Sequence, residues 1–395
     1  MSIRDVAGMQ KTFGYRIYPM DEQAIALDNQ LYLCQKLYNA ALEERITWHK
    51  NGVAIGYTMQ ANELPELKKS LPEYKEVHSQ VLQDVLRRVD KAYKNFFRRC
   101  KDKKGKAGFP RFKGRNRFKS ITYPQSGFSI EGNDLKLTKN GKIRMVYHRP
   151  IEGEIKTLTI KRDAVGDWWA TFTVELPDVP MKEPMTVIGV DVGLENLVTL
   201  STGEAIGTPR YLRKSERNIS VLSRKLSRTE KRSKRREKAR IKLARAQRRV
   251  EDQRNDFLHK LSRGLVERAD LIAFEDLNIQ NMQKNHCLSK SIADASWGKL
   301  IEMTRYKAVE AGGAVILVDP RGTSILCSRC GAAVPKRLDQ RLHSCQSCGF
   351  EIDRDWNAAL NILKRVGPDG AELLNKRLVE ATPLPLPSGG GKYGP

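Results

Sequence analysis

The spacing of apolar residues along the first half of the chain predicts a strand, then helices, then further strands. Residues 11–19 alternate with the period of two that is typical of a strand. From Asp21, apolar residues recur every three or four positions as far as Gly52, and residues 77–101 repeat this helical pattern. Residues 128–177 contain short alternating runs separated by turn residues. This order predicts a β-barrel interrupted by a helical insertion.

The pattern changes near residue 186, where nearly continuous apolar runs replace alternation. The run TVIGVDVG at 186–193 is typical of a strand buried on both faces. Residues 197–206 read as an antiparallel return through a Thr-Gly turn, and residues 269–277 and 313–319 as two more buried strands. We therefore expect a multidomain chain that combines α+β and α/β folds.

The charge of the chain points to a polyanionic partner. Lys and Arg number 71 against 46 Asp and Glu, a formal net charge of +25. Residues 211–250 hold 17 Lys and Arg against three Glu. A long helix or helical pair lying along a nucleic-acid backbone fits this stretch, and a solubilising charge run is the alternative. Residues 104–123 add a basic, aromatic loop suited to phosphate contact and base stacking.

Two features favour a reducing, cytoplasmic location. No apolar run approaches the ~20 residues that a membrane-spanning helix needs, and residues 1–19 lack an apolar signal region. The seven cysteines do not form a disulfide framework, because three of them are scattered. Closely spaced cysteines in such a compartment indicate metal binding.

Four cysteines form the pattern CxxC-x14-CxxC: Cys327, Cys330, Cys345 and Cys348. Four thiolates at this spacing can surround one Zn²⁺ as a tetrahedron. Since cysteine fills every ligand position, no place is left for a substrate. We predict one structural zinc ion.

Several Asp and Glu residues occupy apolar strand positions or a helix start, where a carboxylate needs a hydrogen-bond or charge partner. Asp191 lies inside the apolar run TVIGVDVG, and Glu275 ends the run LIAFE. Asp353 and Asp355 begin a predicted helix, where acids are also common as caps. A cap or a buried salt bridge explains each acid separately. Taken together, these elements could bring three carboxylates to one sheet edge, where two Mg²⁺ ions would suit phosphodiester hydrolysis.

The blocks GVDVG, FEDL, SIADASWGKL, VDPRGTSILCSRCG and CQSCGFEIDRDWNAALNI resemble those of TnpB proteins. TnpB proteins are transposon-encoded, RNA-guided DNA endonucleases related to type V CRISPR effectors. YRIYP, LYNAALEERI, DKAYKNFFRR and GFPRFK extend the likeness through the first half of the chain. The resemblance covers residues 11 to about 365.

The resemblance implies a bilobed arrangement of domains. It implies a wedge β-barrel (1–20 and 104–180) with a helical recognition domain (21–103). A RuvC-like RNase H fold (186–320 and 350–367) follows, with an inserted zinc-ribbon module (321–349). Residues 368–395 are Pro/Gly-rich, and we expect a disordered tail.

The resemblance also implies functional residues. Asp191, Glu275 and Asp355 would form the catalytic, magnesium-binding triad, with Asp353 as the second choice for the last position. Tyr57 and Gln83 match positions that contact a short DNA motif flanking the target. For the nucleic-acid backbone we select four arginines of the basic stretch, Arg235, Arg236, Arg248 and Arg249. Basic residues of the zinc module, Lys336, Arg337 and Arg341, are candidates for contact near the cut.

The expected function is therefore that of an Mg²⁺-dependent, RNA-guided DNA endonuclease of a transposon. Its partners would be a transposon-derived guide RNA and double-stranded DNA, and we expect a prokaryotic, nucleoid-associated monomer. Two alternatives remain open. One is a guide-RNA-dependent DNA-binding protein that does not cut, and the other is a protein-only, structure-specific nuclease.

Overall fold

The computed structural model describes residues 9–102, 107–114, 117–337 and 340–366. The predicted tail and part of the basic loop at 104–123 lie outside these ranges. The chain divides into two compact units, one up to residue 178 and one from residue 179. Each unit has its own hydrophobic core. In the described residues, no helix is both long and apolar enough to cross a membrane.

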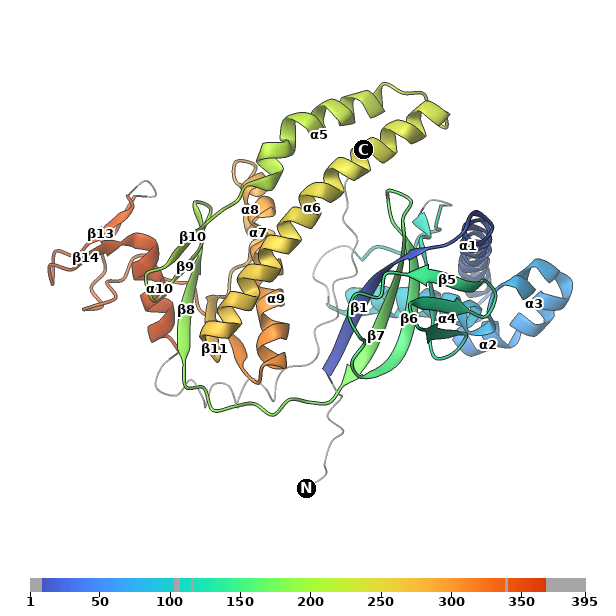
Figure 1. Cartoon of the computed structure of the whole chain (residues 1–395), viewed down its shortest axis with the longest axis horizontal. Coiled ribbons are helices and arrows are strands. Elements are labelled where there is room, and N and C mark those ends of the chain that lie inside the picture. Colours follow the sequence, from blue (N-terminus) through green and yellow to red (C-terminus); the bar gives the residue numbers. More distant parts are fainter. Residues whose placement is uncertain (1–8, 103–106, 115–116, 338–339, 367–395) are drawn as a thin grey trace. The chain divides into compact units, whose positions relative to one another are not determined.

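The first unit contains one seven-stranded antiparallel sheet, in the order β2-β6-β7-β1-β5-β4-β3 (Figure 1). Its strands are β1 (Met9–Tyr18), β2 (Ser120–Tyr123), β3 (Phe128–Glu131), β4 (Asp134–Leu137), β5 (Gly141–Met145), β6 (Glu154–Arg162) and β7 (Trp168–Leu176). The end strands of this ladder, β2 and β3, have no pairing with each other in the described residues. The predicted barrel is thus a sheet whose ladder is open.

The helices of the first unit lie between β1 and β2 in the chain. They are α1 (Asp21–Lys50), α2 (Tyr57–Asn62), α3 (Leu64–Ser70), a 3-10 turn (Pro72–Glu76) and α4 (Ser79–Asp102). The apolar stripes of α1 and α4, including Leu27 and Leu82, join Phe172 of the sheet in one core. The two helices that the periodicity predicts at 21–52 and 77–101 are confirmed.

The second unit is built on a mixed five-stranded sheet in the order β10-β9-β8-β11-β12 (Figure 1). The strands are β8 (Val187–Val192), β9 (Asn196–Leu200), β10 (Ala205–Gly207), β11 (Leu271–Glu275) and β12 (Ala314–Val318). The strands β8, β11 and β12 are parallel, while β9 runs antiparallel to β8. The predicted strands and the antiparallel return are confirmed.

Helices cover both faces of this sheet. They are α5 (Tyr211–Ser227), α6 (Lys234–Arg268), α7 (Ile279–Met282), α8 (Ser289–Ala295), α9 (Trp297–Glu310) and α10 (Arg354–Lys364). Ile272 and Phe274 of β11 join the core formed with α6, α8 and α9. The intervening residues Leu271 and Ala273 pack instead with Ile362 of α10. Alternate residues of each central strand therefore face α10.

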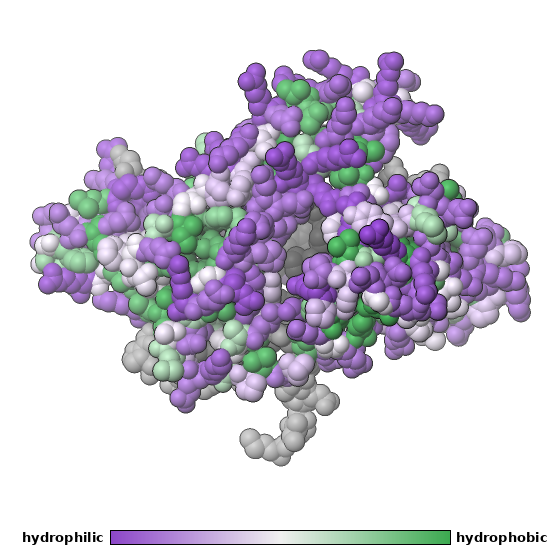
Figure 2. All heavy atoms as spheres, in the orientation of Figure 1, coloured by the Kyte–Doolittle hydropathy of each residue, from purple (hydrophilic) through white to green (hydrophobic). Residues whose placement is uncertain are grey.

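The basic stretch at 211–250 forms a helical pair, which was one of the two predicted forms. The helices α5 and α6 lie side by side, joined by a short turn (Figure 1). No residue of α5 is buried, whereas α6 buries apolar residues such as Leu258 toward its end. Hydrophilic side chains cover most of the visible surface of this pair (Figure 2). The pair is long, basic and solvent-exposed.

Candidate active site

Asp191 and Glu275 lie on adjacent parallel strands at matching positions. Val190 of β8 is in register with Phe274 of β11. The next residue of each strand, Asp191 and Glu275, therefore comes at the matching position. Side chains in register on neighbouring parallel strands point to the same face of the sheet. Since Val190 and Phe274 belong to the core on the other face, both carboxylates face α10.

A glycine allows α10 to approach β8 closely. Gly189 lies two residues before Asp191 and therefore on the same face of β8. A Cβ at Gly189 would lie 2.7 Å from the backbone nitrogen of Leu363, and still closer to the carbonyl oxygen of Ala359. Asp355 is one helical turn before Ala359 and is buried. The crossing of α10 over Gly189 thus brings the third acid toward the other two.

The electrostatics of the three acids reflect their proximity. Burial raises the pKa of Asp191 well above its ordinary value, and the charges of Glu275 and Asp355 raise it further. Burial also raises the pKa of Glu275, although the hydroxyl of Thr323, which donates to its carboxylate, acts in the opposite direction. Like charges gathered at a partly buried place favour protonation or the binding of a cation.

Asp353 and Asp355 have different environments. The exposed Asp353 caps α10 by accepting hydrogen bonds from the backbone amides of Asp355 and Trp356, at 2.9 and 3.0 Å. The buried Asp355 pairs with Arg354 at 3.0 Å and with Arg341 at 3.4 Å. The capping interpretation is therefore confirmed for Asp353, which leaves Asp355 as the acid directed at the site.

The four cysteines form a compact cluster. The Sγ atoms of Cys327 and Cys348 are 3.8 Å apart, and those of Cys330 and Cys345 are 3.6 Å apart. Tetrahedral zinc–thiolate bonds of about 2.3 Å place sulfurs at about this separation. Burial opposes ionisation of Cys345, but hydrogen bonds from the amides of Cys348 and Ser347 lower its pKa to about 6. The donor set fits zinc.

Within the part of the chain that the structure describes, only these cysteines bring three or more His, Cys, Asp or Glu ligand atoms within 4.8 Å of one another. The three acids form a wider group, in which two arginines already neutralise Asp355. The cysteine cluster thus has the geometry of a closed metal site, whereas the acids form a wider group of carboxylates.

Polar residues absent from the sequence predictions connect the cysteine cluster to the acids. The side chain of Asn357 in α10 accepts from the amide of Ser328 and donates to the carbonyl of Leu326. Asn361, one turn later, donates to the carbonyls of Thr323 and Leu326. Thr323 in turn donates to Glu275. The four-residue spacing of the two asparagines on one helix was the available sequence signal.

The predicted DNA-motif residues lie in the first unit. Tyr57 begins α2, and the guanidinium of Arg87 in α4 lies 5.3 Å from its ring centroid. Gln83 is half-buried and precedes Arg87 by one turn of α4. Gln83 and Arg87 therefore share one helix face, and Tyr57 lies against Arg87.

The four arginines selected on the basic stretch all lie in α6, but they differ in their contacts. Arg236 donates to the carbonyls of Leu226 and Thr229, which closes the turn between α5 and α6. Arg248 pairs with Asp252 at 3.5 Å. Arg236 therefore has a structural role that the charge pattern did not indicate.

The fold and these two sites define a mixed α/β protein with a closed cysteine cluster beside a wider group of carboxylates. The family model described as "Probable transposase" matches residues 171–286, and the Cas12f1-like TNB domain matches residues 297–362. A helix-turn-helix domain model matches residues 9–53, where the structure has β1 and the single helix α1.

A protein of Streptomyces pristinaespiralis named "Putative RNA-guided DNA endonuclease" is 36% identical over 364 residues, covering 90% of this chain and 89% of the relative. Another, "Putative RNA-guided DNA endonuclease InsQ" of Escherichia coli, is 30% identical and covers 89% and 91% of the two chains. The chain belongs to the TnpB family of RNA-guided DNA endonucleases, as the sequence motifs predict.

A solved structure supports the fold. The protein in a cryo-EM structure of a Cas12f1-sgRNA-target DNA complex matches with a TM-score of 0.55 at 12% identity. The match covers 90% of this chain and 99% of the other. At this identity the likeness concerns the fold alone.

Proposed function

We propose that this protein is an RNA-guided endonuclease that hydrolyses double-stranded DNA beside a short flanking motif. Family membership supports the guide RNA and DNA as partners. The observation that carries the chemistry is the convergence of Asp191, Glu275 and Asp355 from β8, β11 and α10. The second unit would then be the RuvC-like nuclease domain, and the first the wedge and recognition domains.

The three carboxylates would hold two Mg²⁺ ions. Their mutual repulsion, seen in the raised pKa of Asp191, is what a divalent cation relieves. Magnesium held by these carboxylates would supply an activated water and stabilisation of the leaving oxygen of a phosphodiester. The protein supplies the positions of the ligands: Thr323 orients Glu275 by its hydroxyl, and the register of β8 and β11 sets Asp191 beside it.

The remaining parts have separate roles. The cysteine cluster would hold one zinc ion that orders the loop carrying Cys327 against α10. The exposed basic pair of α5 and α6 would follow the nucleic-acid backbone, with Arg235 and Arg249 among the contacts. In the first unit, Tyr57 and Gln83 would contact the flanking motif.

The test begins with the RNA that co-purifies with the protein. The variable end of this RNA is replaced by a sequence complementary to a target on a plasmid library with randomised flanking sequence. The library is incubated with the complex in Mg²⁺, and the cut products are sequenced. The wild-type complex should cut next to one motif, and Asp191→Ala should bind the same target without cutting. Persistent cutting by Asp191→Ala would remove the triad assignment.

Two outcomes favour the alternatives. If the wild-type complex binds the programmed target but leaves it intact in Mg²⁺, the protein is an RNA-guided binder. If protein stripped of RNA cuts the same DNA as fast as the complex, it is a protein-only nuclease.

A further inference from the structure

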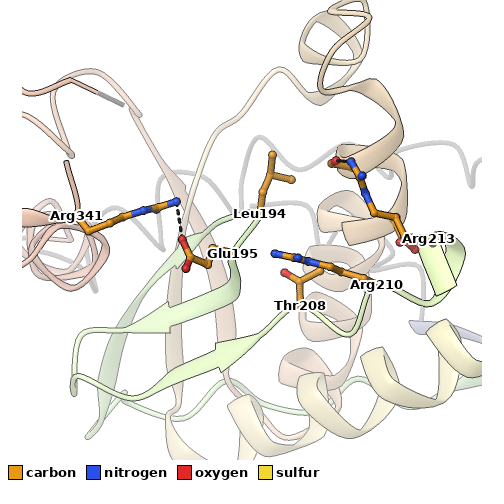
Figure 3. A pocket seen from close by; sticks show the side chains of 8 residues that line it. Leu194, Glu195, Thr208, Arg210, Arg213 and Arg341 are labelled. Atoms are coloured by element: carbon orange, nitrogen blue, oxygen red, sulfur yellow. Dashed lines mark hydrogen bonds and ion pairs between the residues drawn. The ribbon is translucent and has the colours of Figure 1, made fainter. Parts of the chain in front are cut away.

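A cavity of about 340 Å³ lies in the second unit (Figure 3), and one of the residues that line it, Arg341, also contacts Asp355 of the acidic group. Thr208, Arg210 and Arg213 line it from the segment that joins β10 to α5 and from the first turn of that helix, and Arg341 lines it from the zinc module. Figure 3 shows Arg210 and Arg341 reaching toward it from opposite sides, with Glu195 between them. Cationic groups and a hydroxyl thus converge on one space.

Two of these groups, the Thr208 hydroxyl and the Arg210 guanidinium, lack a hydrogen-bond or ion-pair partner among the described residues. The Oγ1 atom of Thr208 is buried and has no hydrogen-bond partner among the described residues. In the same part of the chain, no hydrogen bond or ion pair of the Arg210 side chain is found. Arg210 also adopts a left-handed backbone conformation, with φ of 54°, which is costly for a residue other than glycine. Such strain is often found at functional sites.

The other charged residues of the cavity have hydrogen-bond or ion-pair partners within the protein. Asp294 accepts from the amide of Leu212 at 3.1 Å and from Arg254 at 2.9 Å. Arg213 donates to the hydroxyl of Ser291 at 2.7 Å. Glu195 pairs with Arg341 at 2.6 Å. The two acids are thus paired with cations, whereas no carboxylate among the described residues forms an ion pair with Arg210 or Arg213.

We propose that this cavity binds a backbone phosphate of the DNA strand that is cut, an inference that rests on the proposed function. A guanidinium donates two parallel hydrogen bonds to a phosphate, and the Thr208 hydroxyl supplies another donor. Arg341 connects the cavity to the acids, because its guanidinium also lies 3.4 Å from Asp355. Because Arg341 both lines the cavity and contacts Asp355, a phosphate held here would be one side chain away from the proposed cutting centre, which favours the cut strand over the guide RNA.

The test uses the full complex with its RNA and compares Arg210→Gln with Lys284→Gln. Lys284 is an exposed residue that follows α7 and does not line the cavity, so both changes remove one charge. Arg210→Gln should leave target binding within about twofold and slow cutting of bound target about tenfold. The cutting rate should also depend less steeply on salt. Arg210→Lys should recover part of the rate, and Lys284→Gln should cut normally.

Equal losses in the Arg210 and Lys284 variants would overturn the proposal, because general charge would then explain both. Normal cutting by Arg210→Gln would overturn it as well. If the wild-type complex does not cut, the proposed function fails separately. The cavity is then judged by titrating labelled single-stranded DNA onto the RNA-free proteins. An unchanged affinity and salt slope for Arg210→Gln would end the proposal there.

Discussion

Replacing Gly189 by alanine tests whether the close crossing of β8 and α10 sets the position of Asp355. The added Cβ would lie 2.7 Å from the Leu363 nitrogen and closer still to the Ala359 oxygen. Both are backbone atoms, so no side-chain rotation relieves the clash and α10 must move. Such overpacking costs about 1–3 kcal/mol. A cost of about 2 kcal/mol would lower the Tm by about 4–8 °C.

The effect on cutting should exceed the effect on stability. A shift of a reacting group by about 1 Å can reduce a rate about 100-fold. Single-turnover cleavage of a programmed target in saturating Mg²⁺ measures this, below the Tm of the variant. Gly264→Ala is the matched control, because Gly264 lies within α6 and a Cβ there meets no atom within 4 Å. It should cut normally and melt slightly higher. If Gly189→Ala cuts at the wild-type rate, the close crossing at Gly189 does not set the position of Asp355.

Three further changes test the site. Thr323→Val removes the hydroxyl that lowers the pKa of Glu275, so the acid limb of the pH–rate profile should move to higher pH while Thr323→Ser keeps it. If the acid limb does not move, the hydrogen bond from Thr323 does not control the pKa of Glu275 during cutting. Asp191→Asn should abolish cutting yet raise the Tm in Mg²⁺-free buffer. Because the folded-state pKa of Asp191 is raised, ionising it in the folded protein costs stability as pH rises, so the gain should grow as the pH rises above 3.8, the ordinary pKa of an aspartate. A difference in Tm between Asp191→Asn and the wild type that does not change with pH would contradict this. Removing zinc with a chelator, then restoring Mg²⁺, should loosen residues 323–328 and reduce cutting at least tenfold. Metal analysis should find one zinc ion per chain. Full cutting activity without zinc would show that the cysteine cluster does not affect the acidic site.

Periodicity predicted the elements well, because burial pattern decides element type. The strands β8 and β11 read as buried runs, and each carries an acid near its end. What the sequence could not supply was their register. The pairing of Val187 with Leu271 depends on the packing of α6 and α10 against the two faces. Their adjacency was therefore an expectation that only the three-dimensional structure could test.

Some features of the site had sequence signals, and others had none. Gly189 interrupts an apolar strand, which is a known sign of close backbone approach. Arg236 could not be separated from the other arginines of its run, because its contacts are with carbonyls of the preceding turn. The left-handed conformation of Arg210 also has no local signal, since arginine rarely adopts it. Long-range packing decides such cases.

The position of an acidic pair directly after a cysteine module in a basic chain has a physical reason. Asp353 caps α10, and Asp355 follows it into the site. The module supplies Arg341, which pairs with Asp355 and Glu195 at once. An arginine and a divalent cation are alternative ways to neutralise the same carboxylate. Cation binding at Asp355 would therefore release one of the two ion pairs of Arg341, and we expect metal and DNA to favour each other through this side chain.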